Sequence, residues 1–293
     1  MNIVKIYLRG ANFSIRSWQL VTLLYLVHTL LSLVLVLPFY SAMKDTIGPS
    51  MALENFHKSF QFTAWTEFTR DFSQKMQVFA GIIGYALLFS LFVQVFLKGG
   101  ILAMIREDYA RFTIKRFAEA CGIWFMRFLQ VSLMVLLLHL VLAFLIWLPA
   151  SLILQHQFTL TLTGQSLIRT ALIALTLHFV LGSLVFLFGE YTRYILFVSG
   201  TKGVFRAFRK AVVLVLKKIY LVYPLFLLLL VNGILLSLAW FFLQKVTGFG
   251  TGFTLLFLVL MQQAVFWLRN MLRLWLTASQ FYLYSKFPTP LIT

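Results

Sequence analysis

Six apolar runs, each long enough for a helix that crosses a bilayer, constrain this sequence more than any other feature. A transmembrane helix needs about 20 mainly apolar residues to cross the hydrocarbon core. Because lipid offers no hydrogen bonds to an open backbone, such runs predict an all-α, polytopic membrane protein. We expect one integral membrane domain over residues 1–293. The predicted spans are 18–40, 76–97, 128–150, 166–189, 219–242 and 252–273.

Composition excludes a water-soluble domain. Hydrophobic residues make up 61% of the chain and charged residues 11%, whereas soluble domains carry about 45–50% apolar and about 25% charged residues. The single cysteine, Cys121, excludes an intrachain disulfide and any zinc or thiol-redox motif. Lipid is the environment in which so much apolar surface is stable.

Positive charge is distributed unevenly between the connections. Of the 25 Lys and Arg residues, 19 lie in residues 1–17, 98–127 and 190–218 or in the C-terminal part from Arg269 onward. Short cytoplasmic loops of membrane proteins carry an excess of Lys and Arg. The bias therefore predicts that both termini are cytoplasmic and that the six spans form three hairpins.

Two of the positively charged segments alternate basic and apolar residues at helical spacing. Residues 111–127 read RFTIKRFAEACGIWFMR, and residues 201–218 read TKGVFRAFRKAVVLVLKK. This pattern is typical of amphipathic helices that lie in the membrane interface, and residues 2–17 form a weaker version. One offset aligns Thr113 and Phe117 with Thr201 and Phe205, so each hairpin follows a basic helix. This threefold pattern has two interpretations, duplication or shared physical requirements.

Glycine and proline mark expected changes of direction. Gly99, Gly100 and Gly200 stand at the start of the inner segments, where glycine permits a sharp turn from a spanning to a surface direction. Pro38 and Pro149 stand at the ends of two predicted spans, where a helix stops at little cost.

The basic segments supply the candidate residues for binding lipid headgroups or an acidic cytoplasmic protein. The cytoplasmic leaflet is anionic, and each basic residue near it contributes about 1 kcal/mol of attraction. The net charge of +17 therefore needs no nucleic-acid partner. The candidates are Arg111, Lys115, Arg116, Arg206, Arg209, Lys210, Arg269 and Arg273.

One acid stands alone in the second half of the chain. Glu190 is the only acidic residue after Glu119. Arg193, Arg269 and Arg273 also lie at the cytoplasmic ends of spans, and Arg269 and Arg273 are one helical turn apart. We expect Glu190 to form a structural ion pair within this group, with Arg269 or Arg273 as its partner, and the arginines to reach lipid phosphates.

Three histidines lie near the middle of spans, where an ionisable side chain is a candidate functional residue. His28, His139 and His178 each have small or polar residues one or two turns away, which indicates that they face other helices. One interpretation is a ligand set for haem, a pigment or a proton relay. The other is a hydrogen bond between helices, and for this reason no cofactor is predicted.

Two segments carry a resemblance to a known family. They read GGILAMIREDYARFTIKRFAEACGIWFMRFLQ and GEYTRYILFVSGTKGVFRAFRKAVVLVLKK. They resemble bacterial six-span proteins related to the membrane domain found beside some glycerophosphodiester phosphodiesterases. The resemblance covers about a quarter of the chain and implies the fold and a place in the bacterial inner membrane. It implies no activity, because the catalytic barrel of those enzymes is absent here.

The sequence predicts a protein that is not an enzyme, since no catalytic or metal-binding motif is present. The first hypothesis is a membrane module that binds or organises anionic lipid or serves as a subunit of a larger membrane complex. The second is a transporter or flippase for a lipid-like or small substrate, based on the hairpins and on mid-span Asn232, Gln262 and Gln263. The third is a haem- or pigment-binding protein that uses the three histidines.

Overall fold

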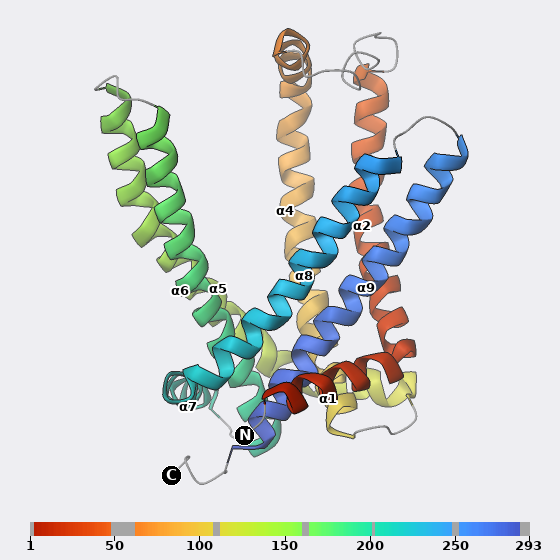
Figure 1. Ribbon diagram of the computed structural model, residues 1–293, viewed down its shortest axis with the longest axis vertical. Coiled ribbons are helices and arrows are strands. Elements are labelled where there is room, and N and C mark those ends of the chain that lie inside the picture. Colours follow the sequence, from red (N-terminus) through yellow and green to blue (C-terminus); the bar gives the residue numbers. More distant parts are fainter. Residues whose placement is uncertain are drawn as a thin grey trace. The chain divides into compact units, whose positions relative to one another are not determined.

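The computed structural model describes residues 3–47, 62–107, 112–159, 164–200, 203–247 and 252–287. All regular secondary structure in these ranges is helical, which confirms the predicted all-α class. The eight helices of the described ranges are α1 (Ile3–Arg16), α2 (Trp18–Ile47), α4 (Phe62–Arg106), α5 (Ile114–Thr159), α6 (Gly164–Ser199), α7 (Val204–Lys217), α8 (Ile219–Thr247) and α9 (Gly252–Ser285) (Figure 1).

Six of these helices are long and apolar enough to cross a membrane. Each overlaps one predicted span, so the described residues contain six candidate spans, which supports a multi-pass membrane protein. The apolar stretches are Trp18–Pro38, Ala80–Arg106, Ile114–Gln155, Ile168–Ser199, Ile219–Thr247 and Gly252–Tyr284.

Tertiary contacts divide the chain into two compact units. The first unit contains Met1–Trp18 and Val95–Thr293, and the second contains Gln19–Gln94. Helix α4 belongs to both, because its last turns from Val95 to Arg106 belong to the first unit. The packing described below is that of the first unit.

The core of the first unit lies toward one end of its long helices. Helix α5 has 46 residues, a length of about 70 Å at 1.5 Å per residue, and the hydrocarbon core is about 30 Å thick. The helices therefore extend well beyond what a span requires. Buried side chains gather in the last part of α6 and of α9, between Leu187 and Phe197 and between Asn270 and Tyr284.

Two short helices cover this end. Helix α1 packs against α9, and α7 packs against α6. The consecutive helices α5 and α6 are in contact, as are α8 and α9. In Figure 1, α1, α7 and the last turns of α9 lie together at the lower end of the first unit.

The expected turn at Gly99-Gly100 is wrong, because α4 continues through both glycines to Arg106. A side chain at either position would strike α5. A Cβ on Gly99 would lie 2.7 Å from the Ala120 carbonyl oxygen, and one on Gly100 would lie 2.7 Å from Cys121 Sγ. These glycines permit close helix packing, which is the common role of small residues between membrane helices. Gly200 does end a helix, with φ of 63° just after α6.

Three further expectations about boundaries are corrected. Residues 114–127 are not a separate surface helix but the first turns of α5, which runs without a break into the span. Pro38 and Pro149 lie inside α2 and α5 and do not end them. Proline removes one backbone donor but leaves the following turns free to remain helical.

Candidate functional site

Three charged side chains meet in the core of the first unit. Lys98 Nζ on α4 lies 2.6 Å from Glu190 Oε2, and Arg193 Nη1 lies 2.6 Å from Glu190 Oε1, one turn along α6. The side chain of Glu190 is 4% exposed, that of Arg193 is 12% and that of Lys98 is 15%. We call these three residues the ion cluster.

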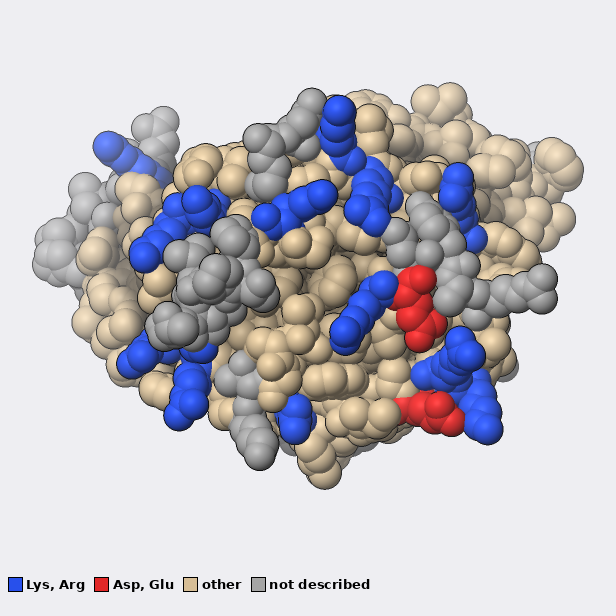
Figure 2. All heavy atoms as spheres, turned by 90° about the horizontal axis from the view of Figure 1, so that it is seen from below, with Lys and Arg blue, Asp and Glu red and all other residues tan. Residues whose placement is uncertain are grey.

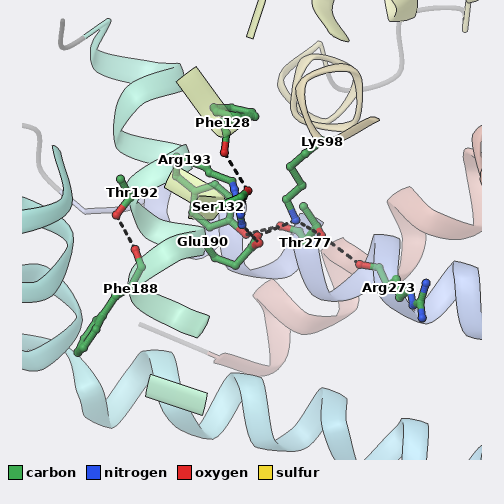
Figure 3. Close-up of polar contacts among 10 residues, drawn as sticks. Lys98, Phe128, Ser132, Phe188, Glu190, Thr192, Arg193, Arg273 and Thr277 are labelled. Atoms are coloured by element: carbon green, nitrogen blue, oxygen red, sulfur yellow. Dashed lines mark hydrogen bonds and ion pairs between the residues drawn. The ribbon is translucent and has the colours of Figure 1, made fainter. Parts of the chain in front are cut away.

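Hydrogen bonds extend the ion cluster to two more helices (Figure 3). Arg193 Nη2 donates to Ser132 Oγ on α5 at 2.9 Å, and Ser132 in turn donates to the Phe128 carbonyl oxygen at 2.8 Å. On the other side, Lys98 Nζ donates to Thr277 Oγ1 on α9 at 3.1 Å. The network therefore joins α4, α5, α6 and α9 through charged and hydroxyl groups.

Two buried tyrosines of α6 tighten the same junction. Tyr194 donates to Glu190 Oε2 at 3.2 Å, so this carboxylate has three donors. Tyr191 donates to Gln280 Oε1 on α9 at 2.7 Å, and Gln280 Nε2 donates to the Val222 carbonyl oxygen on α8 at 3.3 Å. Both tyrosines are fully buried. All of the long helices represented in the first unit thus meet around Glu190 or its neighbours.

The ion cluster carries two cations and one anion. Buried charges are costly unless they are paired and hydrogen-bonded, and the short distances to Glu190 meet that condition. Removing one partner from a buried ion pair leaves an uncompensated charge, which costs about 3–5 kcal/mol. Glu190 therefore acts as the central anion that holds the ends of α4 and α6 together.

Lys98 was missed as a partner because sequence hydropathy ends the spans too early. The predicted spans end at Leu97 and Gly189, immediately before Lys98 and Glu190. Hydropathy treats each charge as a stop, but two opposite charges on different helices neutralise each other. In the structure, α4 and α6 continue about two to three turns beyond the predicted span ends, to Arg106 and Ser199.

The predicted partners of Glu190 are brought together only in part. Glu190 pairs with Arg193, a member of the predicted group, and with Lys98, and not with Arg269 or Arg273, the partners that the sequence indicated. Arg269 Nη2 instead donates to Ser237 Oγ on α8 at 3.2 Å. In Figure 3 the Arg273 side chain points away from the carboxylate, and the carbonyl oxygen of Arg273 accepts the Thr277 hydroxyl at 3.1 Å.

The three histidines lie apart from the ion cluster in the chain. His139 Nδ1 lies 2.9 Å from the Val135 carbonyl oxygen of its own helix, and its ring faces Gly182 of α6. His178, one turn before Gly182, packs beside Trp147, and its Nδ1 is buried without a hydrogen-bond partner. His28 belongs to the second unit and contacts the Leu24 carbonyl oxygen at 2.7 Å.

The mid-span amides are also placed. Asn232 Nδ2 donates to the Tyr7 hydroxyl on α1 at 2.9 Å, which anchors α1 to α8. Gln262 and Gln263 are exposed on α9. Within the described residues, no group of three or more His, Cys, Asp or Glu side chains is arranged to hold a metal ion.

The predicted basic residues occupy the surface of α5 and α7. Lys115, Arg116, Arg206 and Arg209 are exposed, and Lys210 is half-buried. Arg111 lies outside the described residues. Figure 2, which views Figure 1 from below, shows Lys and Arg side chains spread over this face with few acidic ones between them.

Comparison with known proteins adds no family to this description. No protein-family model, curated protein or solved structure matches the chain. The resemblance to the membrane domain of glycerophosphodiester phosphodiesterases therefore stays a prediction.

Proposed function

We propose that this protein is a non-enzymatic membrane module that binds and organises anionic phospholipid through the basic face formed by α1, α7 and the first turns of α5. In this proposal the basic face is cytoplasmic, both termini are on the same side, and the membrane is the bacterial inner membrane. The spans form three hairpins. A role as a subunit of a larger membrane complex would use the same face toward an acidic partner.

The observation that carries this proposal is the division of α1 and α7 into three sides. At 100° per residue, one side of α1 holds the buried residues Ile6, Gly10 and Phe13. A second side exposes apolar groups, and a third exposes basic groups. On α1 the exposed apolar residues are Val4, Leu8 and Ile15, and the exposed basic residues are Lys5, Arg9 and Arg16.

Helix α7 repeats this division. Its buried side holds Ala207, Ala211 and Val215. Its apolar side exposes Phe205 and Leu216, which are 77% and 51% exposed. Its basic side exposes Arg206, Arg209 and Lys217. A helix that exposes adjacent apolar and basic stripes suits the boundary between headgroups and acyl chains. Such helices attract anionic lipid by about 1 kcal/mol per basic residue near the surface.

Native mass spectrometry of the chain, extracted from bilayers with equal amounts of phosphatidylglycerol and phosphatidylcholine, tests this function. We expect retained lipid to be mainly phosphatidylglycerol, and this preference to fall as salt rises, because ionic screening weakens contacts near the surface. Replacement of Arg116 and Arg206 by Gln should reduce the preference. The matched control replaces Arg169 and Lys245 by Gln. These residues are exposed near the start of α6 and the end of α8, the ends that are farther along the chain from α7. Equal retention of the two lipids by the unaltered chain would refute the proposal.

A further inference from the structure

Two helices of 14 residues and the first 14 residues of a longer helix can be placed in one register. They are α1 from Ile3, the start of α5 from Ile114 and α7 from Val204. Placing these first residues in register aligns residues 3–16, 114–127 and 204–217 without a gap. We call these segments the basic helices. The register differs from the sequence alignment of Phe117 with Phe205, which is wrong because Phe117 is 4% exposed and Phe205 is 77% exposed.

The new register aligns small buried residues in all three basic helices. Gly10, Cys121 and Ala211 are equivalent, and each is buried. A Cβ on Gly10 would collide with Ser279 Oγ of α9, and Cys121 Sγ lies against Gly100 of α4. Each basic helix thus packs against the last part of a long helix: α1 on α9, the start of α5 on α4, and α7 on α6.

The ends of those long helices are equivalent as well. Gly100 on α4 and Ser279 on α9 contact basic helices at the equivalent small residue, and in the same register Lys98 is equivalent to Thr277. Aligning the buried residues Leu187 and Tyr194 of α6 with those of α4 and α9 makes Glu190 equivalent to Lys98 and Thr277. These three residues are the ones that meet, since Lys98 contacts both Glu190 and Thr277. The same positions are buried on each helix, namely Val95, Leu187 and Leu274, then Leu102, Tyr194 and Phe281.

The same kind of contact therefore occurs three times, once for each basic helix. Each basic helix contacts the helix end that precedes it in the chain, and α1 closes the ring by contacting the last helix, α9. The contact between α1 and α9 joins the two ends of the sequence, which neither local sequence nor connection length requires.

Two exposed positions carry a basic residue in all three basic helices. The first position holds Lys5, Arg116 and Arg206, and the second holds Arg16, Arg127 and Lys217. The residue before the second position is an exposed apolar one in every case, namely Ile15, Met126 and Leu216. No other position is basic in all three basic helices: Arg209 is equivalent to Leu8 and Glu119, and Lys210 is equivalent to Arg9 but also to Ala120.

We propose that the chain has three equivalent sites for anionic phospholipid headgroups, one on each basic helix, and that the repeated basic pair binds the phosphates. The two members of a pair are 11 residues apart, about three turns or about 17 Å along one face of the helix. Each site therefore holds two headgroups, one at each member of the pair, and the apolar neighbour of the second basic residue contacts an acyl chain. This inference rests on the proposed function, because it assigns the residues and the number of sites to that activity.

Three double variants of the full chain test the inference, each replacing one pair by Gln: K5Q/R16Q, R116Q/R127Q and R206Q/K217Q. Native mass spectrometry in detergent with phosphatidylglycerol counts the lipids that remain bound. We expect each variant to lose a comparable share, about one third of the retained anionic lipid, since each removes two basic contacts of six. The matched control, R209Q/K210Q, removes the same charge from α7 at positions that are not basic in all three basic helices, and it should lose less than R206Q/K217Q.

The outcomes separate this inference from the proposed function. If the unaltered chain retains phosphatidylglycerol no better than phosphatidylcholine, the proposed function fails and this inference fails with it. If the preference is present but R209Q/K210Q loses as much lipid as R206Q/K217Q, binding depends on total charge, and only the inference of three sites is refuted. Strongly unequal losses among the three pairs would also refute it. Size-exclusion chromatography confirms that each variant is folded, which the exposure of all six side chains favours.

Discussion

Replacing Glu190 by Gln should destabilise the first unit more than any other single charge removal in the described residues. The substitution keeps the size of the side chain and removes its charge. Lys98 and Arg193 would then remain as two buried cations, with side chains 15% and 12% exposed, and without their shared anion. Breaking a buried pair in this way costs about 3–5 kcal/mol. For a chain of this size that corresponds to a fall in melting temperature of about 10 °C.

The assay is thermal unfolding in detergent, followed by tryptophan fluorescence and by the monomer peak remaining after heating. Glu119→Gln is the matched control, because it removes the same charge from an exposed position on α5, and we expect it to change stability by less than about 0.5 kcal/mol. The double variant K98Q/E190Q should be more stable than E190Q alone. It leaves one buried cation in place of two, and contacting residues couple by about 0.5–3 kcal/mol.

The reasoning is refuted if E190Q melts within about 1 °C of the unaltered chain, a shift that corresponds to less than 1 kcal/mol. It is also refuted if K98Q/E190Q is less stable than E190Q. That result would mean that Lys98 contributes through hydrogen bonding to Thr277 and not through its charge.

Three further predictions concern packing, the histidines and orientation. Gly10→Ala should destabilise the chain by about 1–3 kcal/mol in the same thermal assay, because the methyl group would collide with α9; Gly122→Ala, which meets nothing within 4 Å, should be neutral or stabilising. His178→Leu should be neutral or stabilising, because the buried Nδ1 has no hydrogen-bond partner to lose; a visible absorption band that disappears in this variant would instead establish a cofactor. A membrane-impermeant maleimide applied to intact cells should label a cysteine at Gln155 and spare one at Lys217, and the reverse pattern would contradict cytoplasmic termini.

The Gly99-Gly100 pair illustrates how local sequence information misleads here. In the sequence, two glycines after an apolar run indicate a turn, because glycine adopts conformations closed to other residues. In the structure the same residues are helical, and their lack of a side chain admits Ala120 and Cys121 of α5. Conformational freedom and small size are both properties of glycine, and only the neighbouring helix decides which one is used.

The sequence by itself determined that this chain is helical and has six candidate membrane spans, because the length and apolarity of each run suffice for that conclusion. It also grouped Glu190 with Arg193, one turn away on the same helix, but indicated Arg269 or Arg273 as the partner, whereas the structure pairs Glu190 with Arg193. The tertiary structure alone chose Lys98, which is separated from Glu190 by 91 intervening residues. It alone also placed α1 against α9 at the other end of the chain. Partners on one helix follow from its periodicity, whereas partners on different helices depend on packing that no local pattern encodes.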